Sequence, residues 1–301
     1  MRLKRNGILL MTLSGILFGF LPILVKWGNQ YHFGAVQTSF CRFAIALAGI
    51  ALLHFYGPQK LKLVNLEALL WRGLLGGLTV LLYFITLQLT TAAKGTLLNY
   101  TYSIWANVFG VLFLKHKPPK GFALILLLAG IGVWLVLGVS FDHFEWGDLT
   151  GVLSGMAAGG GVAAIKVARK TDNALTVFGS FSFFGFFFAG LGLLVFPWIG
   201  GFCSDLGRFQ PLNPAGISIL LLMGLCAMGA QLLFTHGYGY TSFAMGTLLS
   251  LITPILAALL GWFCLGEPLT PHFIMGTLLV LSACLILGWH EGKPKNQLAS
   301  L

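Results

Sequence analysis

The sequence has 301 residues, of which 57% are hydrophobic and only 9% are charged. Soluble domains are about 45–50% apolar and about 25% charged, so this composition excludes a soluble enzyme, a disordered chain and a nucleic-acid-binding domain. Long unbroken apolar runs predict an all-α integral membrane protein, because the strands of a membrane barrel would alternate apolar and polar residues.

The chain contains ten apolar segments of membrane-spanning length. A spanning helix needs roughly 20 apolar residues, so these segments leave room only for short connections and for no sizeable soluble domain. The segments comprise residues 7–28, 33–55, 67–89, 93–114, 119–138, 147–167, 175–198, 215–236, 240–264 and 271–289.

Membrane topology explains the formal net charge of +10 better than a nucleic-acid partner does. Placing the N-terminus in the cytoplasm puts most Lys and Arg residues on the inner side, Arg72 among them, whereas the outer connections carry Asp and Glu. Cytoplasmic connections of membrane proteins are enriched in Lys and Arg. The protein is therefore predicted to lie in the inner (plasma) membrane with both termini in the cytoplasm. Its basic residues are expected to lie close to anionic lipid head groups.

The sequence contains an internal repeat in two separate blocks. Residues 13–26 (LSGILFGFLPILVK) align without gaps with residues 153–166 (LSGMAAGGGVAAIK), and residues 94–114 align with residues 245–265. Leucine matches alone would mean little in so apolar a chain, but the blocks also share Gly, Ser, Thr and Lys residues in order. The repeat predicts two related halves.

Each half is predicted to hold five helices, with residues 6–138 as the first repeat, residues 147–289 as the second and residues 290–301 as a cytoplasmic tail. Because five is an odd number, the second copy must enter the membrane with the opposite polarity. Inverted repeats of this kind are a device of secondary transporters. Channels also use such duplication, so the repeat favours transport more firmly than it favours alternating access.

A small-residue-rich first helix, Pro254 in the ninth segment and the motif LGEPLT (265–270) together resemble the EamA branch of the drug/metabolite transporter superfamily. The resemblance covers nearly the whole chain as two EamA-like repeats. It implies ten helices, cytoplasmic termini, peripheral fifth and tenth helices, and movement of small metabolites, often outward. The first copy departs from the family pattern at one point. The second copy carries the family's acidic residue within residues 266–268 (GEP), whereas the corresponding residues 115–117 of the first copy are KHK. Any structural role of that acid is therefore expected on one side only.

Acidic residues are absent from the middle of every predicted segment. A proton-coupled exporter of organic cations commonly needs a buried carboxylate, so the sequence argues against such a cation exchanger and indicates no site for a coupling ion.

The His and Cys residues form no paired motif, so no catalytic residue, metal or cofactor is expected. The remote alternatives are a membrane-embedded enzyme that acts on a lipid and a non-transporting scaffold.

Arg42 lies inside the second segment, within AVQTSFCRFAIALAG. A central Arg costs roughly 2.5–3.5 kcal/mol on insertion scales, so it must face protein or a wet cavity. Two interpretations are open. Arg42 binds a carboxylate or phosphate of the substrate, or it satisfies backbone carbonyls at a helix break.

The fourth and ninth segments each carry a stripe of small or polar residues on one helical face. Such stripes either allow close helix packing or line a central cavity. In the second case, the candidate substrate-binding residues besides Arg42 are Asn99, Tyr102, Trp105, Asn107, Ser250 and Thr253. Pro254 leaves a carbonyl without its usual helical donor, so a bend or gate is expected there.

Lys26 and Lys166 occupy matching places in the two copies, near the outer and the inner face respectively. One interpretation is that each guards one mouth of a pathway and attracts anions. The other is that each long side chain reaches lipid head groups from a helix end, as Lys94 is also expected to do.

These features predict a secondary transporter that exports a small anionic or zwitterionic metabolite, such as an amino acid, by alternating access. Its expected partners are the small-molecule substrate and membrane lipids. The alternative is an exporter of uncharged or aromatic drugs, which the 14% aromatic content suggests. That suggestion is the weaker one, because membrane proteins also use aromatic residues for interfacial anchoring.

Overall fold

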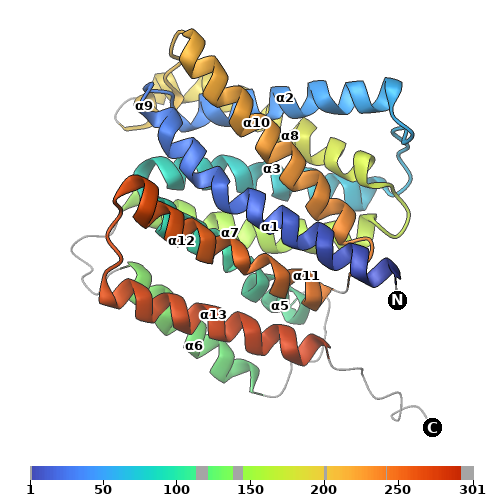
Figure 1. Ribbon diagram of the computed structural model, residues 1–301, viewed down its shortest axis with the longest axis vertical. Helices are drawn as coiled ribbons and strands as arrows, with labels where there is room; N and C mark the ends of the chain where they lie inside the picture. The colour runs from blue at the N-terminus through green and yellow to red at the C-terminus, as the bar shows by residue number, and fades with distance from the viewer. Residues whose placement is uncertain (1, 113–120, 138–144, 200–201, 242, 293–301) are drawn as a thin grey trace.

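The structure, a computed structural model, describes residues 2–112, 121–137, 145–199, 202–241 and 243–292, and these residues form helices and no strands (Figure 1). Seven helical stretches in the described residues have the length and composition to cross a membrane, and two shorter apolar stretches lie in α6 and α13. The helices are α1 (Arg2–Asn29), α2 (Ala35–Tyr56), α3 (Leu66–Leu89), α4 (Ala92–Tyr100), α5 (Tyr102–Leu112), α6 (Phe122–Leu137), α7 (Trp146–Ala168), α8 (Ala174–Ile199), α9 (Phe202–Gly207), α10 (Pro214–Gly237), α11 (Phe243–Ser250), α12 (Ile252–Leu265) and α13 (Pro271–Gly292).

Each apolar segment expected from the sequence coincides with one helix or with two consecutive helices, and only the short α9 was not expected.

Local capping defines several helix ends. The Asn65 side chain accepts a hydrogen bond from the Ala68 amide at 3.0 Å, which caps α3, and the Asn213 side chain caps α10 in the same way. Gly266, with φ at 67°, ends α12 in the left-handed conformation that glycine adopts without strain.

The fourth and ninth predicted segments are each divided into two helices. The break between α11 and α12 falls at Leu251, where Pro254 has no N–H to offer the carbonyl one turn earlier. The break between α4 and α5 falls at Thr101, whose Oγ1 donates to the Leu98 carbonyl at 2.6 Å, and back-bonding of this kind bends helices. In the repeat alignment the two breaks lie one residue apart.

Helices α1 and α7, which contain the first pair of aligned sequence blocks, each pack against helices from the other part of the chain. Helix α1 packs against α10 and α12, whereas its counterpart α7 packs against α3 and against the α4–α5 pair. A Cβ on Gly155 of α7 would lie only 2.6 Å from the Leu98 carbonyl oxygen, and one on the aligned Gly15 of α1 would overlap Ile252. Helices α6 and α13 pack side by side along one edge of the bundle (Figure 1).

Candidate functional site

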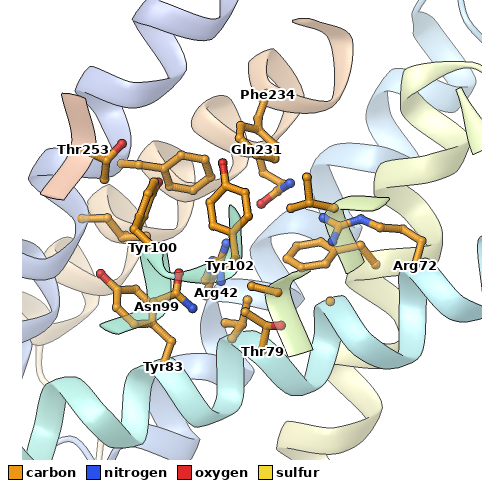
Figure 2. Close-up of a pocket in the computed structure, with 17 residues that line it drawn as sticks. Arg42, Arg72, Thr79, Tyr83, Asn99, Tyr100, Tyr102, Gln231, Phe234 and Thr253 are labelled. Atoms are coloured by element: carbon orange, nitrogen blue, oxygen red, sulfur yellow. The ribbon is translucent and has the colours of Figure 1, made fainter. Parts of the chain in front are cut away.

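A cavity of about 80 Å³ lies between helices of both halves (Figure 2). It has room for several water molecules, since one needs about 10–15 Å³ of such space. No lining residue in the described ranges comes from α6 or α13. The lining residues are Phe18, Leu21, Arg42, Arg72, Gly76, Thr79, Val80, Tyr83, Asn99, Tyr100, Tyr102, Ala158, Val162, Phe181, Gln231, Phe234 and Thr253.

Arg42 reaches this cavity from α2 and is 4% exposed. Its guanidinium carbon lies 5.2, 5.5 and 5.7 Å from the ring centroids of Phe43, Phe84 and Phe181, all within cation–π range. Within the described residues it donates no hydrogen bond to a backbone carbonyl. Within that part of the chain Arg42 therefore makes none of the contacts that would be required if its role were only to satisfy backbone carbonyls.

Arg72 is a second buried arginine of the cavity, and its position differs from the expectation. It was counted among the inner-side charges, yet its side chain is 4% exposed and extends from α3 toward the middle of the cavity (Figure 2). Its guanidinium carbon lies 4.3 Å from the Phe181 ring centroid, and its Nε has no hydrogen-bond partner. The helical spacing of Arg72, Gly76, Thr79 and Tyr83 is the sequence signal that could have placed it there.

Other polar side chains of the cavity also escaped the sequence analysis. Tyr83 shares a hydrogen bond of 2.8 Å with Thr96, which orients its ring across α3 and α4. Gln231 is 6% exposed and comes from α10, where it is a single amide in an apolar run. An isolated polar residue within a membrane-length run usually faces the interior of the helix bundle, so Gln231 could have been proposed as a lining residue from its sequence context.

Four of the predicted binding residues line the cavity and three do not. Trp105 packs against Phe109, with ring centroids 6.3 Å apart, and does not line the cavity. The Asn107 amide donates to the Ser103 carbonyl at 3.0 Å, and the Ser250 hydroxyl donates to the Gly246 carbonyl at 2.7 Å. Both groups therefore satisfy backbone carbonyls near the helix breaks. The four that line the cavity are Arg42, Asn99, Tyr102 and Thr253.

The side chains of Asn99 and Thr253 join the cavity wall to helices of the other half. The Asn99 amide donates to the Ser154 hydroxyl on α7 at 3.1 Å. The Thr253 hydroxyl donates to the Gly15 carbonyl on α1 at 3.0 Å. Pro254 is buried next to Thr253 in the first turn of α12.

Lys26 and Lys166 each bond to a carbonyl of the protein, in related places. The Lys26 ammonium donates to the Thr90 carbonyl, where α3 gives way to α4. The Lys166 ammonium donates to the Tyr238 carbonyl at 2.8 Å and to the Thr241 carbonyl, where α10 gives way to α11. Extending the second aligned block without a gap pairs Thr90 with Thr241. The two lysines therefore make equivalent contacts in the two halves.

Two further contacts lie at the start of α4. Lys94 was expected to reach head groups, but its ammonium pairs with the buried carboxylate of Asp148 on α7 at 2.5 Å. The Glu267 carboxylate accepts hydrogen bonds from the amides of Ala92 at 2.7 Å and Ala93 at 3.3 Å, so it caps α4 from the other half. The corresponding residues 115–117 of the first copy lie outside the described residues.

Membrane-length helices around a small, largely apolar cavity with two buried arginines are the arrangement expected of a multi-pass membrane protein of the transporter class. The EamA-like transporter family matches residues 5–138 and 145–289, and the chain therefore belongs to this family, as its sequence pattern predicted. Membership implies a small-molecule substrate. In the described residues no group of three or more His, Cys, Asp or Glu side chains could hold a metal ion.

Relatives of the chain include named transporters from distant organisms. The pseudopaline exporter CntI of Pseudomonas aeruginosa (strain UCBPP-PA14) is 25% identical, and the match covers 95% of this chain and 96% of that protein. An uncharacterized transporter of Archaeoglobus fulgidus is also 25% identical, over 96% of this chain and 98% of that protein. The human solute carrier family 35 member G1 is 23% identical over 76% of this chain and 64% of its own length.

A protein crystal structure shares the fold, with a TM-score of 0.63 at 16% sequence identity. The match covers 96% of this chain and 99% of the other. At this identity the likeness concerns the fold alone.

Proposed function

We propose that the protein is a secondary transporter that moves a small anionic or zwitterionic metabolite outward across the inner membrane. The observation that carries this proposal is the buried Arg42, which faces a cavity with no Asp or Glu among its described lining residues. A buried guanidinium without a carboxylate partner is costly until an anion neutralises it. The Asn99 amide and the Thr253 hydroxyl supply further polar groups for the rest of such a solute.

The proposed architecture is ten spans in two inverted repeats, residues 6–138 and 147–289, with cytoplasmic termini. Two observations support it. The contacts of α1 with α10 and α12 have counterparts in those of α7 with α3 and the α4–α5 pair, so exchanging the halves preserves the packing. Parts of the chain expected on the same side also contact each other. The Asn173 amide donates to the Lys60 carbonyl, and the Gln37 amide in the first turn of α2 donates to the Gln210 carbonyl.

Alternating access is the proposed mechanism, with Lys26 and Lys166 as equivalent contacts at opposite ends. Each lysine ties the first helix of its half to the connection between the third and fourth helices of the same half. Breaking one contact would free one end while the other end stays closed. The breaks at Thr101 and Leu251 give α4–α5 and α11–α12 places to bend during this exchange.

The outward direction rests on the name of one relative, the pseudopaline exporter CntI, which is 25% identical to this chain. A second candidate function is export of uncharged aromatic compounds. The aromatic rings of Phe18, Phe181 and Phe234 favour it, because they line the same cavity. A hydrophobic wall also serves an anionic solute with an apolar body, and the buried arginines favour the anionic candidate.

An unbiased metabolite comparison of deletion and overexpression strains tests the proposal. We expect small acids or zwitterions to accumulate in cells of the deletion strain and to appear in the medium of the overexpressing strain. Changes confined to uncharged aromatic compounds would favour the second candidate function and count against the first.

A further inference from the structure

We infer that the cavity binds a small solute with two negative charges, and that Arg42 and Arg72 each neutralise one of them. This inference rests on the proposed function and makes its substrate class more specific. It assigns Arg72, which the sequence placed among topology-setting charges, to the recognition of the substrate's second anionic group.

The two guanidinium groups share one cavity and one aromatic neighbour. Both lie against the same Phe181 ring, with their carbons 5.7 Å (Arg42) and 4.3 Å (Arg72) from its centroid. Both side chains also line the same cavity of about 80 Å³. A solute bound in that cavity therefore has both positive groups in its wall.

The charges of the two arginines are not balanced by the protein. Each is 4% exposed, and in the described part of the chain neither forms an ion pair with a carboxylate. Two like charges buried near each other repel, and burial raises the cost further. A dianion removes both penalties, whereas a monoanion leaves one charge uncompensated.

The hydrogen-bonding capacity of Arg72 is also unused. Its Nε is buried and has no partner, and contact with the Phe181 ring does not replace a hydrogen bond to an N–H group. A guanidinium binds a carboxylate through two parallel hydrogen bonds. Arg72 lines the cavity, and within the described residues its guanidinium forms no hydrogen bond, as expected of a ligand-binding arginine rather than of a packing one.

Binding to purified protein in detergent tests this inference. The ligands are the dicarboxylates from malonate to adipate, each paired with its monoamide, which keeps the shape and removes one charge. We expect the best-fitting dicarboxylate to bind about ten- to a hundredfold more tightly than its monoamide, the range for a hydrogen bond to a charged group. Ethyl phosphate, largely a dianion at pH 8, shows whether one doubly charged group serves as well as two carboxylates.

Variants assign the effect to individual arginines. In Arg72→Gln the preference for the dicarboxylate should largely disappear while the Kd of the monoamide stays the same. In Arg42→Gln both ligands should bind more weakly. Arg5→Gln, which changes an exposed arginine, should keep the wild-type preference. Because the preference of the wild-type protein is itself a test, the inference does not depend on the folding of Arg72→Gln.

Equal Kd values for dicarboxylates and monoamides in the wild-type protein would overturn the inference. It would also be overturned if Arg72→Gln weakened the binding of the dicarboxylate and of its monoamide by the same factor. If monoanions or amino acids still bind through Arg42 in that case, the proposed function stands without the second charge. Failure of every anion to bind would instead overturn both.

Discussion

At the scale of single residues, Arg42 connects the sequence to the proposed chemistry. Arg42→Lys keeps a positive charge but loses the planar fork that matches a carboxylate, so we expect the Kd of an anionic substrate to rise about tenfold. Arg42→Gln also removes the charge and should raise the Kd further. The Kd and the melting temperature of each variant in detergent are the measurements.

A structural role of Arg42 predicts a different outcome. The Lys and Gln variants would then lose thermal stability, and the Kd of the protein that remains folded would change little. An unchanged Kd for a verified carboxylate substrate in well-folded Arg42→Gln would move the proposed site to Asn99, Tyr102 and Thr253.

The lining of the cavity could be predicted from sequence only in part. Arg42 and Asn99 stand out because a polar group inside an apolar run must find a polar environment. Arg72 did not, because an arginine near a segment end is ordinarily a topology signal. Asn107 and Ser250 share the polar character of the lining residues, but their side chains satisfy nearby backbone carbonyls, and periodicity does not distinguish these two environments.

At the scale of helices, the apolar runs predicted each membrane-length element, because burial in lipid requires long apolar stretches with satisfied backbone groups. The interruption of the ninth segment at Leu251 lies three residues before Pro254, whose missing N–H can be read from the residue type. The matching break at Thr101 has no proline. It depends on a side-chain hydrogen bond to the Leu98 carbonyl, and residue type alone does not indicate that bond.

Close packing of α7 against the break between α4 and α5 gives a prediction for Gly155. A Cβ there would lie 2.5 Å from Thr101 Oγ1 and 2.6 Å from the Leu98 carbonyl oxygen, and the backbone atom has little freedom to move. We expect Gly155→Ala to destabilise the protein by about 1–3 kcal/mol, as overpacking typically does, and to lower the melting temperature.

Gly130 provides the matched control for this substitution. It also lies inside a helix, α6, but an added Cβ would meet nothing within 4 Å. Gly130→Ala should therefore leave the melting temperature unchanged or raise it slightly, because alanine favours the helix by up to about 1 kcal/mol. Equal effects of the two substitutions would show that close approach at Gly155 is not important for stability.

At the scale of the whole molecule, the equivalent contacts of Lys26 and Lys166 give the proposed exchange of conformations a test. A cysteine introduced as Thr79→Cys on α3 reports on the cavity, and a membrane-impermeant thiol reagent is applied from one side at a time. Lys26→Gln should raise the labelling rate from outside by about tenfold, since it removes a hydrogen bond from a charged group. Lys166→Gln should raise the rate from inside by a similar factor.

The prediction requires that the two substitutions increase labelling from opposite sides of the membrane. If both substitutions increased labelling from the same side, the two contacts would not control opposite ends of the cavity. Unchanged labelling in both variants would return the lysines to a purely structural role in joining helices.

Counterflow in liposomes tests most directly the central claim that the protein transports a small anion through the Arg42 cavity. Liposomes that contain purified protein and an unlabelled acid found in the metabolite comparison are diluted into a trace of the labelled acid. We predict saturable accumulation of the chemically unchanged label with the wild-type protein, and its loss with Arg42→Gln of equal stability. Accumulation only of uncharged aromatic compounds, or anion flux that Arg42→Gln leaves intact, would contradict the claim.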